Sequence, residues 1–442
     1  MRNTRIPLFR LTLFGSPAFS VAALGLPILI FLPPLYAELG LSLTVVGAVF
    51  MATRIFDVVT DPVFGWLGDK ISSPWGRRRP ALLVAVPFLA AGVYFAFFPG
   101  ESPTATSLFL SMLLLYAGWT AFTISHTAWA GELSDDYDER SRIMGVLQVF
   151  GLLGILVVSA LPALLDMSSA KVDMTQRTNI VGLVVLISLP IFALMSSVAV
   201  GEPTRKVQAP IVWREAVNSF VSNLPLRRLL LTDLLLGFQG GVNGTMHFFF
   251  IGIVLGLPQA ASLMLVVIGV AGLVAAPIFV RVSYRIGKHR TLCLGALLSS
   301  VASLTHFFIP AGNFWLVFAT FVLIGINIGA RDMMIRSIMA DVVDEDAVRT
   351  GRERGALFYS MLTLTAKLGA ALAVGMVLPV LDWVGFDPAG ENTEATITGV
   401  RMVVAATPTF ALTAVAAIMW RFPLDKDRQR ILRAELEARA AG

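Results

Sequence analysis

The chain has few of the residues that cross-link a protein or cover a soluble surface. Cys293 is the single cysteine among 442 residues, which excludes an internal disulfide and a metal site built from several cysteines. Only 14% of the residues are charged, whereas about 25% is usual for a soluble domain. Hydrophobic residues make up 56% of the chain, and the mean hydropathy is +0.77. This composition excludes a soluble globular protein and indicates an integral membrane protein.

Long apolar runs recur along the chain and predict membrane-spanning helices. A bilayer offers no water to backbone polar groups, so spanning segments are helices or strands of a closed barrel. The runs are about 20 residues long, the length of a spanning helix rather than of a barrel strand. The predicted spans are 11–37, 43–68, 80–98, 106–133, 141–165, 179–201, 229–255, 259–283, 290–311, 314–340, 354–381 and 397–421. We therefore expect an all-α membrane protein with twelve transmembrane helices.

The longest polar connection divides these runs into two groups of six. We expect an N-terminal six-helix half (1–201), a cytoplasmic linker (202–228), a C-terminal six-helix half (229–421) and a cytoplasmic tail (422–442). A weak repeat supports two related halves, since the sequence 61–65 (DPVFG) is echoed by 276–280 (APIFV). Two parallel six-helix halves around a central cavity form the major facilitator fold. Ala276 stands where the first copy has Asp61, so an acidic site at this position belongs to the first half alone.

The charges of the loops predict the orientation in the membrane. The net charge is +5, but the basic residues are dispersed over short loops, which argues against a nucleic-acid partner. They fall on alternate loops, as in Arg77–Arg79 and Arg349–Arg354, while the other loops are mainly acidic. By the positive-inside rule, both termini are cytoplasmic, and we expect a bacterial-type inner membrane. The basic N-terminus resembles a signal sequence, but we interpret the run that follows as a retained first helix.

Asp57 and Asp61 are the most informative residues of the chain. They lie one helical turn apart in an apolar segment, about 18 and 12 Å from its cytoplasmic end at 1.5 Å per residue. A charge at this depth is costly, so such residues usually line an ion or substrate path. Two neighbouring carboxylates repel each other, and a monovalent cation or a proton relieves that repulsion. The spacing predicts ion coupling; the alternative is permanent pairing with Arg54 or Lys367.

Other charges within the predicted helices leave two interpretations open. Lys367 is either a static partner of the carboxylates or a partner that they exchange when cation and substrate bind. Asp332 and Arg336 have the i,i+4 spacing of a helical ion pair, and with Arg331 they predict an inner gate or a structural pair.

The cytoplasmic loops predict a gate, and the histidines predict no metal site. Asp69, Arg77 and Arg78 are interpreted as a latch that closes on the acidic loop around Glu139, and Asp341 joins this gating set. His126 and His247 are isolated, without metal-ligand spacing, and belong to the predicted cavity. The sequence contains no phosphate-binding glycine loop, nucleophile elbow or zinc motif. We therefore expect neither an enzyme nor a cofactor, and no metal beyond a monovalent cation.

Several motifs together resemble one transporter family. They are Asp57-x-x-x-Asp61-Pro62-x-x-Gly65-Trp66, Trp75-Gly76-Arg77-Arg78, Glu132-Leu133 with Asp138-Glu139-Arg140, Ala340-Asp341-Val342-Val343-Asp344 through Thr350-Gly351, and Lys367-Leu368-Gly369. The set resembles the glycoside-pentoside-hexuronide:cation symporters, the melibiose permease group of the major facilitator superfamily. It resembles the animal sodium-dependent lysolipid transporters more distantly. The resemblance covers most of the chain in order.

The resemblance implies a cation site and puts the sugar site in doubt. The cation site would consist of Asp57, Thr60, Asp61 and Thr120, with Arg54 and Lys367 as charge partners. Thr60 stands where the melibiose permease has Asn, which leaves the choice among Na⁺, H⁺ and Li⁺ open. The charged and aromatic sugar contacts of that permease are replaced here by Pro17, Thr123, Thr127 and Gln148. The predicted cavity residues are Thr123, His126, Thr127, Gln148, Gln239, Asn243 and His247, a lining that suits an amphiphile as readily as a sugar.

Three functional hypotheses follow. The leading one is a monomeric secondary transporter that couples Na⁺ or H⁺ to symport of a small organic solute, sugar-like by the resemblance, through alternating access. The second is an ion-coupled carrier of an amphiphile such as a lysolipid or a hydrophobic metabolite. The third is a membrane assembly or sensor protein that keeps the fold without transporting.

Overall fold

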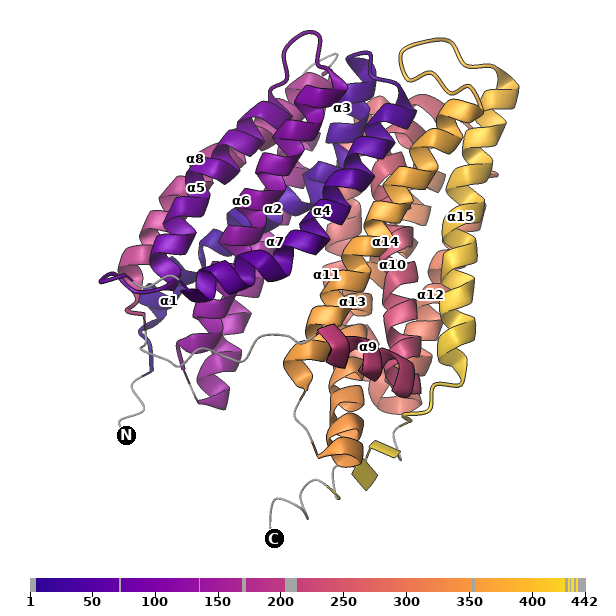
Figure 1. Cartoon of the computed structure of the whole chain (residues 1–442). Helices are drawn as coiled ribbons and strands as arrows, with labels where there is room; N and C mark the ends of the chain where they lie inside the picture. The colour runs from indigo at the N-terminus through magenta and orange to yellow at the C-terminus, as the bar shows by residue number, and fades with distance from the viewer. Residues whose placement is uncertain are drawn as a thin grey trace. The chain divides into compact units, whose positions relative to one another are not determined.

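The computed structural model describes residues 5–70, 73–134, 136–168, 172–202, 213–351 and 354–425, together with 428–429, 431–432 and 435. Every regular element in these ranges is a helix (Figure 1). The chain divides into two compact units. The first unit is Met1–Pro210 with Leu378–Asp382 and Asp387–Glu391, and the second is Ile211–Val377 with Trp383–Phe386 and Asn392–Gly442.

The first unit contains the helices α1 to α8. Their bounds are α1 Leu8–Gly15, α2 Pro17–Ile30, α3 Leu32–Glu38, α4 Leu43–Lys70, α5 Arg78–Phe97, α6 Ala105–Glu132, α7 Tyr137–Ser168 and α8 Met174–Ala199. The span predicted over 11–37 is thus divided among three consecutive helices. Pro17 begins α2 because a proline lacks the N–H that the first helical turn leaves unpaired. The apolar run predicts the total length of the membrane segment, but where the segment divides into separate helices depends on its prolines.

The second unit contains α9 to α15, except for Leu378–Asp382 near the end of α14. Their bounds are α9 Trp213–Ser222, α10 Leu224–Phe248, the π-helix η1 Phe249–Val254, α11 Pro258–Ile286, α12 Lys288–Thr305, α13 Phe314–Thr350, α14 Gly355–Trp383 and α15 Glu394–Trp420. Figure 1 shows α9 lying across one end of this unit. The described part of the predicted linker 202–228 therefore contains a helix and the first turn of the next. Most of the predicted tail 422–442 lies outside the described residues.

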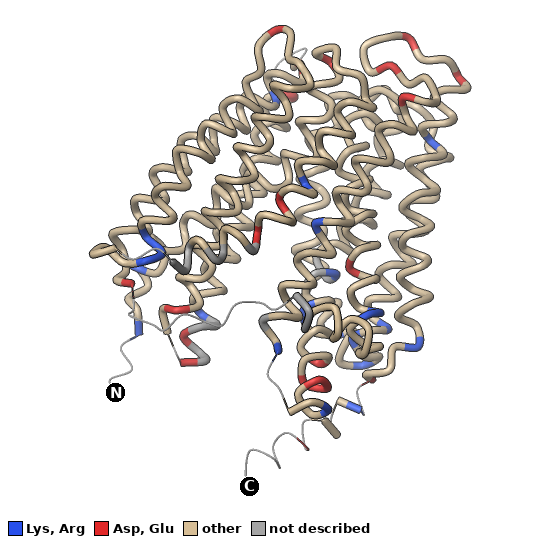
Figure 2. The backbone as a smooth tube through the Cα atoms, in the orientation of Figure 1, with Lys and Arg blue, Asp and Glu red and all other residues tan. Residues whose placement is uncertain are grey.

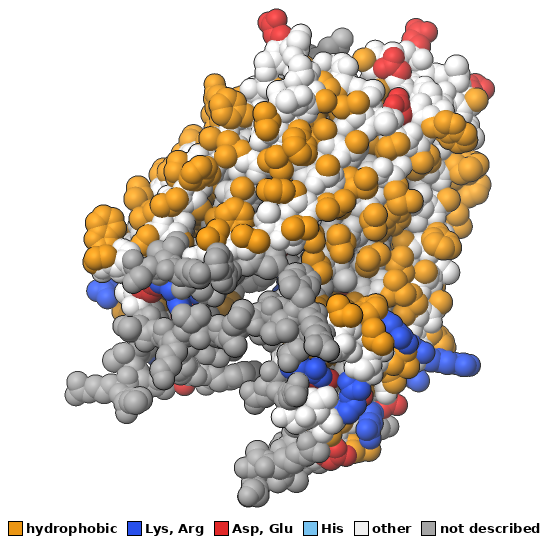
Figure 3. Space-filling model, in the orientation of Figure 1, with side chains coloured by type: hydrophobic (Ala, Val, Ile, Leu, Met, Phe, Trp, Pro, Cys, Tyr) orange, Lys and Arg blue, Asp and Glu red, His pale blue; other side chains and the backbone are white. Residues whose placement is uncertain are grey.

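The chain is a multi-pass membrane protein. Ten helical segments of the described chain are long and apolar enough to cross a bilayer. The predicted runs 229–255 and 290–311 coincide with α10–η1 and α12, which are not among these ten. Figure 3 shows hydrophobic side chains over the sides of the helices, and Figure 2 shows charged residues concentrated toward helix ends and connecting loops. This distribution matches helices surrounded by lipid along their length.

Glycines bring neighbouring helices close together within each unit. In the first unit, a Cβ on Gly92 of α5 would lie 2.4 Å from the Leu115 backbone of α6. In the second unit, a Cβ on Gly237 of α10 would lie 2.5 Å from the Ala366 carbonyl oxygen of α14. Small residues allow such close backbone approach between membrane helices.

Candidate cation site

Two carboxylates of α4 share one hydroxyl group of α6. The Thr120 Oγ1 atom lies 2.6 Å from Asp57 Oδ1 and 3.0 Å from Asp61 Oδ1. Asp57 is 2% exposed and Thr120 is 3% exposed, while Asp61 is half-buried. The i,i+4 spacing thus directs both carboxylates toward α6, where three oxygen-bearing side chains converge.

An arginine on the same helix compensates part of this charge. Arg54 Nη1 lies 3.4 Å from Asp57 Oδ2, one turn before it. The guanidinium carbon lies 4.6 Å from the ring centre of Tyr116 and 5.7 Å from that of Trp119. Both rings belong to α6, so cation–π contacts hold the buried guanidinium on the α4–α6 interface. The sequence identified Arg54 as a charge partner but gave no sign of these rings.

The shared hydroxyl has a chemical consequence. A threonine hydroxyl carries one proton and donates one hydrogen bond, whereas an ionised carboxylate only accepts. Thr120 therefore cannot donate a hydrogen bond to two ionised carboxylates at once. A proton on one carboxyl would let it donate to the threonine oxygen, and a monovalent cation among the three oxygens would relieve the same conflict. The arrangement suits a bound H⁺ or a small monovalent cation.

Thr60 was predicted as a cation ligand, but its hydroxyl does not point to the carboxylates. Its hydroxyl donates to the main-chain oxygens of Phe56, at 3.0 Å, and Asp57, at 3.2 Å. Among the described residues these main-chain atoms are its hydrogen-bond partners. Thr120, from another helix, supplies the hydroxyl that meets the carboxylates.

The predicted cavity residues of the first unit fall into two environments. Thr127 and Gln148 are exposed, and the buried Thr123 hydroxyl oxygen has no hydrogen-bond partner among the described residues. His126 is 3% exposed, packs against Phe14, and its Nε2 lies 2.9 Å from the Phe14 carbonyl oxygen. His126 is therefore committed to a hydrophobic cluster of the described core.

The predicted cavity residues of the second unit lie on α10. Gln239 is buried, and its Oε1 lies 3.5 Å from Arg331 Nη1 of α13, which also donates to the Leu236 carbonyl oxygen at 3.2 Å. Asn243 is half-buried. His247 is buried with Nε2 2.7 Å from the Ala261 carbonyl oxygen.

Asp233 is a deep acidic residue that the sequence analysis missed. It lies on α10, and its Oδ2 accepts a hydrogen bond of 2.8 Å from the Thr365 hydroxyl of α14. Lys367, also on α14, lies two residues further along, in the second unit, whereas Asp57 and Asp61 lie in the first. The pairing of Lys367 with those carboxylates stays a prediction. The rule that singled out Asp57, a charge inside an apolar run, would have found Asp233 as well.

The predicted latch of the first unit engages a different carboxylate from the one expected. Arg77 and Arg78 lie 2.9 and 2.8 Å from Glu132 Oε1 at the end of α6. Glu202 accepts from the backbone N–H groups of both arginines, at 2.8 and 2.7 Å, at the start of α5. Glu139 accepts instead from Ile6 N at 3.0 Å and pairs with Arg142 at 2.9 Å. The Asp69 side chain lies outside the described residues.

The predicted gating residues of the second unit are spread over its end. Asp341 is buried and pairs with Lys288 Nζ at 2.7 Å. Arg336 is exposed, and its carbonyl oxygen accepts from the Tyr359 hydroxyl at 3.1 Å. The Asp332 side chain lies outside the described residues, so its predicted pair with Arg336 is not described.

This helical architecture, with charged groups held between helices, is that of a membrane transporter of the major facilitator type. Residues 13–426 match the MFS/sugar transport protein family, and the chain belongs to that family. The predicted resemblance is thereby confirmed. The members are transporters and not enzymes.

Named relatives and solved structures agree with this assignment. The chain is 22% identical to the glucuronide carrier protein homolog of Escherichia coli, over 96% of this chain and 92% of that protein. It is 21% identical to the human sodium-dependent lysophosphatidylcholine symporter 1, over 87% of this chain and 77% of that protein. A bacterial homolog of the human lysosomal transporter Spinster, in an inward-facing conformation, has the same fold with a TM-score of 0.68, 15% identity and 97% coverage of both chains.

Proposed function

We propose that the chain is a symporter in which a monovalent cation, Na⁺ or H⁺, binds at Asp57, Asp61 and Thr120 and drives transport of a small organic solute. The main support for this proposal is that the Thr120 hydroxyl lies within hydrogen-bond distance of both carboxylates. Since the hydroxyl can donate to only one of them, the arrangement favours a state with an added positive charge. Li⁺ stays within the proposed range of ions, whereas the Thr60 hydroxyl, which bonds main-chain oxygens, is left out of the proposed site.

Alternating access would link this site to the ends of the molecule. In this proposal twelve spans cross the bilayer: the ten most apolar segments together with α10–η1 and α12. Both termini then lie in the cytoplasm. The pairs of Glu132 with Arg77 and Arg78, and of Asp341 with Lys288, are the ion pairs that would open and close during the cycle. Lys367 would act as an exchangeable counter-charge. Cation and solute would then each tighten the binding of the other.

A glycoside-like solute is the leading substrate class, because the named bacterial relative is a glucuronide carrier homolog. An amphiphile is the second candidate, because the human relative is a lysophosphatidylcholine symporter. The small, uncharged Thr123 and Thr127 favour neither class over the other. The cation site is the same under both.

A thermal-shift screen of purified protein tests the proposal. Na⁺, Li⁺ and pH are varied against sugars, glycosides and lysolipids, since a ligand that binds only the folded protein raises its unfolding temperature. We expect a stabilising cation whose effect is lost in Asp57→Asn and kept in Glu101→Gln, an exposed loop carboxylate. A cation effect that is equal in all three proteins would overturn the assignment of the site.

A further inference from the structure

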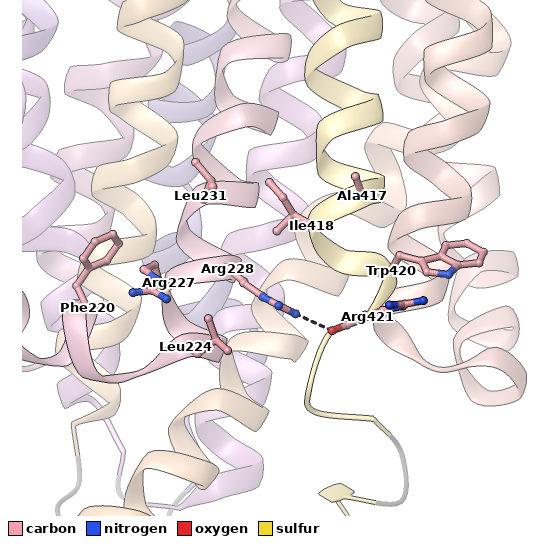
Figure 4. Close-up of a pocket in the computed structure, with 9 residues that line it drawn as sticks. All are labelled: Phe220, Leu224, Arg227, Arg228, Leu231, Ala417, Ile418, Trp420 and Arg421. Carbon is pink, nitrogen blue, oxygen red and sulfur yellow. Dashed lines mark hydrogen bonds between the residues drawn. The ribbon is translucent and has the colours of Figure 1, made fainter.

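A groove opens at the end of the second unit, between α9–α10 and the end of α15. Its volume is about 860 Å³, and all of its walls belong to this one unit (Figure 4). It lies apart from Gln239, Arg331 and Asp233, none of which lines it. Neither the proposed cation site nor the proposed gating pairs use this groove.

One side of the groove is strongly basic. Arg227 and Arg228 of α10 and Arg421, which follows α15, all line it. Arg228 Nη1 donates to the Arg421 carbonyl oxygen at 2.6 Å, drawn as the dashed line in Figure 4. Among the described residues, none of these three guanidiniums forms an ion pair. Three neighbouring positive charges repel one another, and an anion with several oxygens would satisfy their planar donor groups.

The other side of the groove is apolar and continues along the helices. Leu231 lies one turn further along α10 than Arg227, and Ala417 and Ile418 face it from α15. Leu231 is 46% exposed. An apolar strip beside a basic cluster complements a molecule with an anionic head and a hydrocarbon chain.

The helix α9 places this groove at the membrane surface. Val217, Phe220 and Val221 form one exposed apolar face of α9, while Ser219 is buried and accepts from Arg354 at 3.0 Å. A short helix with one apolar face exposed lies in the interfacial region of a bilayer. Trp420, at the rim of the groove, is also exposed, as aromatic residues at the membrane interface usually are.

We propose that this groove binds an anionic phospholipid of the adjoining leaflet. The phosphate binds Arg227, Arg228 and Arg421, and one acyl chain lies along Leu231 and Ile418. A soluble phosphate would leave the apolar strip uncovered, and a zwitterionic lipid, whose own cation balances its phosphate, would add no net negative charge to the three arginines. The site is independent of the proposed transport function.

Lipid titration followed by native mass spectrometry tests this site. The full-length protein is titrated with phosphatidylglycerol, with phosphatidylcholine of the same chains, and with inorganic phosphate. The test variant is Arg227→Gln/Arg228→Gln. The matched control is Arg281→Gln/Arg285→Gln, which removes two exposed arginines of α11 outside the groove. A third variant, Ala417→Trp, fills the apolar side without changing charge.

We expect phosphatidylglycerol to bind the wild type and the control alike. Each basic residue near an anionic headgroup contributes about a fivefold gain in affinity, so the test variant should bind roughly 25-fold more weakly. Ala417→Trp should also weaken the binding of phosphatidylglycerol. Equal binding by the test and control variants, equal binding of phosphatidylcholine, or inorganic phosphate that displaces the lipid with no effect of Ala417→Trp would each overturn the proposal.

Discussion

Removing the hydroxyl of Thr120 should weaken cation binding far more than removing that of Thr60. Thr120→Val keeps the shape of the side chain but deletes the oxygen that lies 2.6 and 3.0 Å from Asp57 and Asp61. A hydrogen bond to a charged group contributes about 1.5–3 kcal/mol. At about 1.4 kcal/mol for each factor of ten, the cation affinity should fall roughly 10- to 150-fold.

Thr60→Val is the matched control, because the Thr60 hydroxyl bonds main-chain oxygens of its own helix. Cation affinity is measured by calorimetric titration of each purified variant. Unfolding temperatures without cation show whether each variant is folded. The reasoning is refuted if Thr120→Val binds the cation like the wild type, or if Thr60→Val is the more strongly impaired of the two.

Three further predictions concern stability, each measured by thermal unfolding of the purified protein. Gly237→Ala places a Cβ 2.5 Å from the Ala366 oxygen and should lower the free energy of unfolding by about 1–3 kcal/mol. Gly269→Ala, with open space around it, is the control and should not lower it. Equal unfolding midpoints for the two variants would contradict the close packing of α10 against α14. Glu132→Gln leaves the buried guanidinium of Arg78 and the half-buried one of Arg77 without their shared carboxylate. It should approach the lower end of the about 3–5 kcal/mol typical of a broken buried pair, and an unchanged midpoint would contradict it. Glu38, at the end of α3, is partly exposed, and desolvation of its remaining surface raises its pKa, opposed by the nearby positive charge of Arg177. The folded protein therefore binds this proton more tightly than the unfolded chain does, and the resulting stability is present at low pH and lost as the pH rises through the folded pKa. Glu38→Gln should therefore raise the unfolding midpoint above that of the wild type at pH 8 but not at pH 4. A variant whose midpoint follows the wild type at both pH values would contradict this.

The sequence predicted the apolar helices well because hydropathy measures the lipid-facing length directly. The predicted run 179–201 corresponds to α8, Met174–Ala199, and 259–283 corresponds to α11, Pro258–Ile286. Hydropathy fails where a helix continues beyond the apolar run. The predicted span 314–340 is the first part of α13, which extends through polar residues to Thr350. It fails for α9 as well, because a ten-residue amphipathic helix resembles a polar linker.

The sequence named the residues of the candidate cation site but not their contacts. Depth in an apolar helix identified Asp57 and Asp61, and the family resemblance supplied Thr120. The role of Glu202 at the start of α5 could not be foreseen, because it depends on how two helix ends meet in space. The position of Arg54 against the rings of Tyr116 and Trp119 depends on the register of α4 against α6 in the same way. Neither register is encoded in spacing along a single helix.

Gradient-driven uptake into proteoliposomes tests the central claim, that Asp57 and Asp61 couple a cation to solute movement. The solute identified by thermal shift is offered with an inward gradient of the stabilising cation or with none. The account predicts that the wild type accumulates solute only with the gradient, and that Asp57→Asn and Asp61→Asn lose accumulation. Accumulation by either variant with an unchanged dependence on the gradient would contradict it.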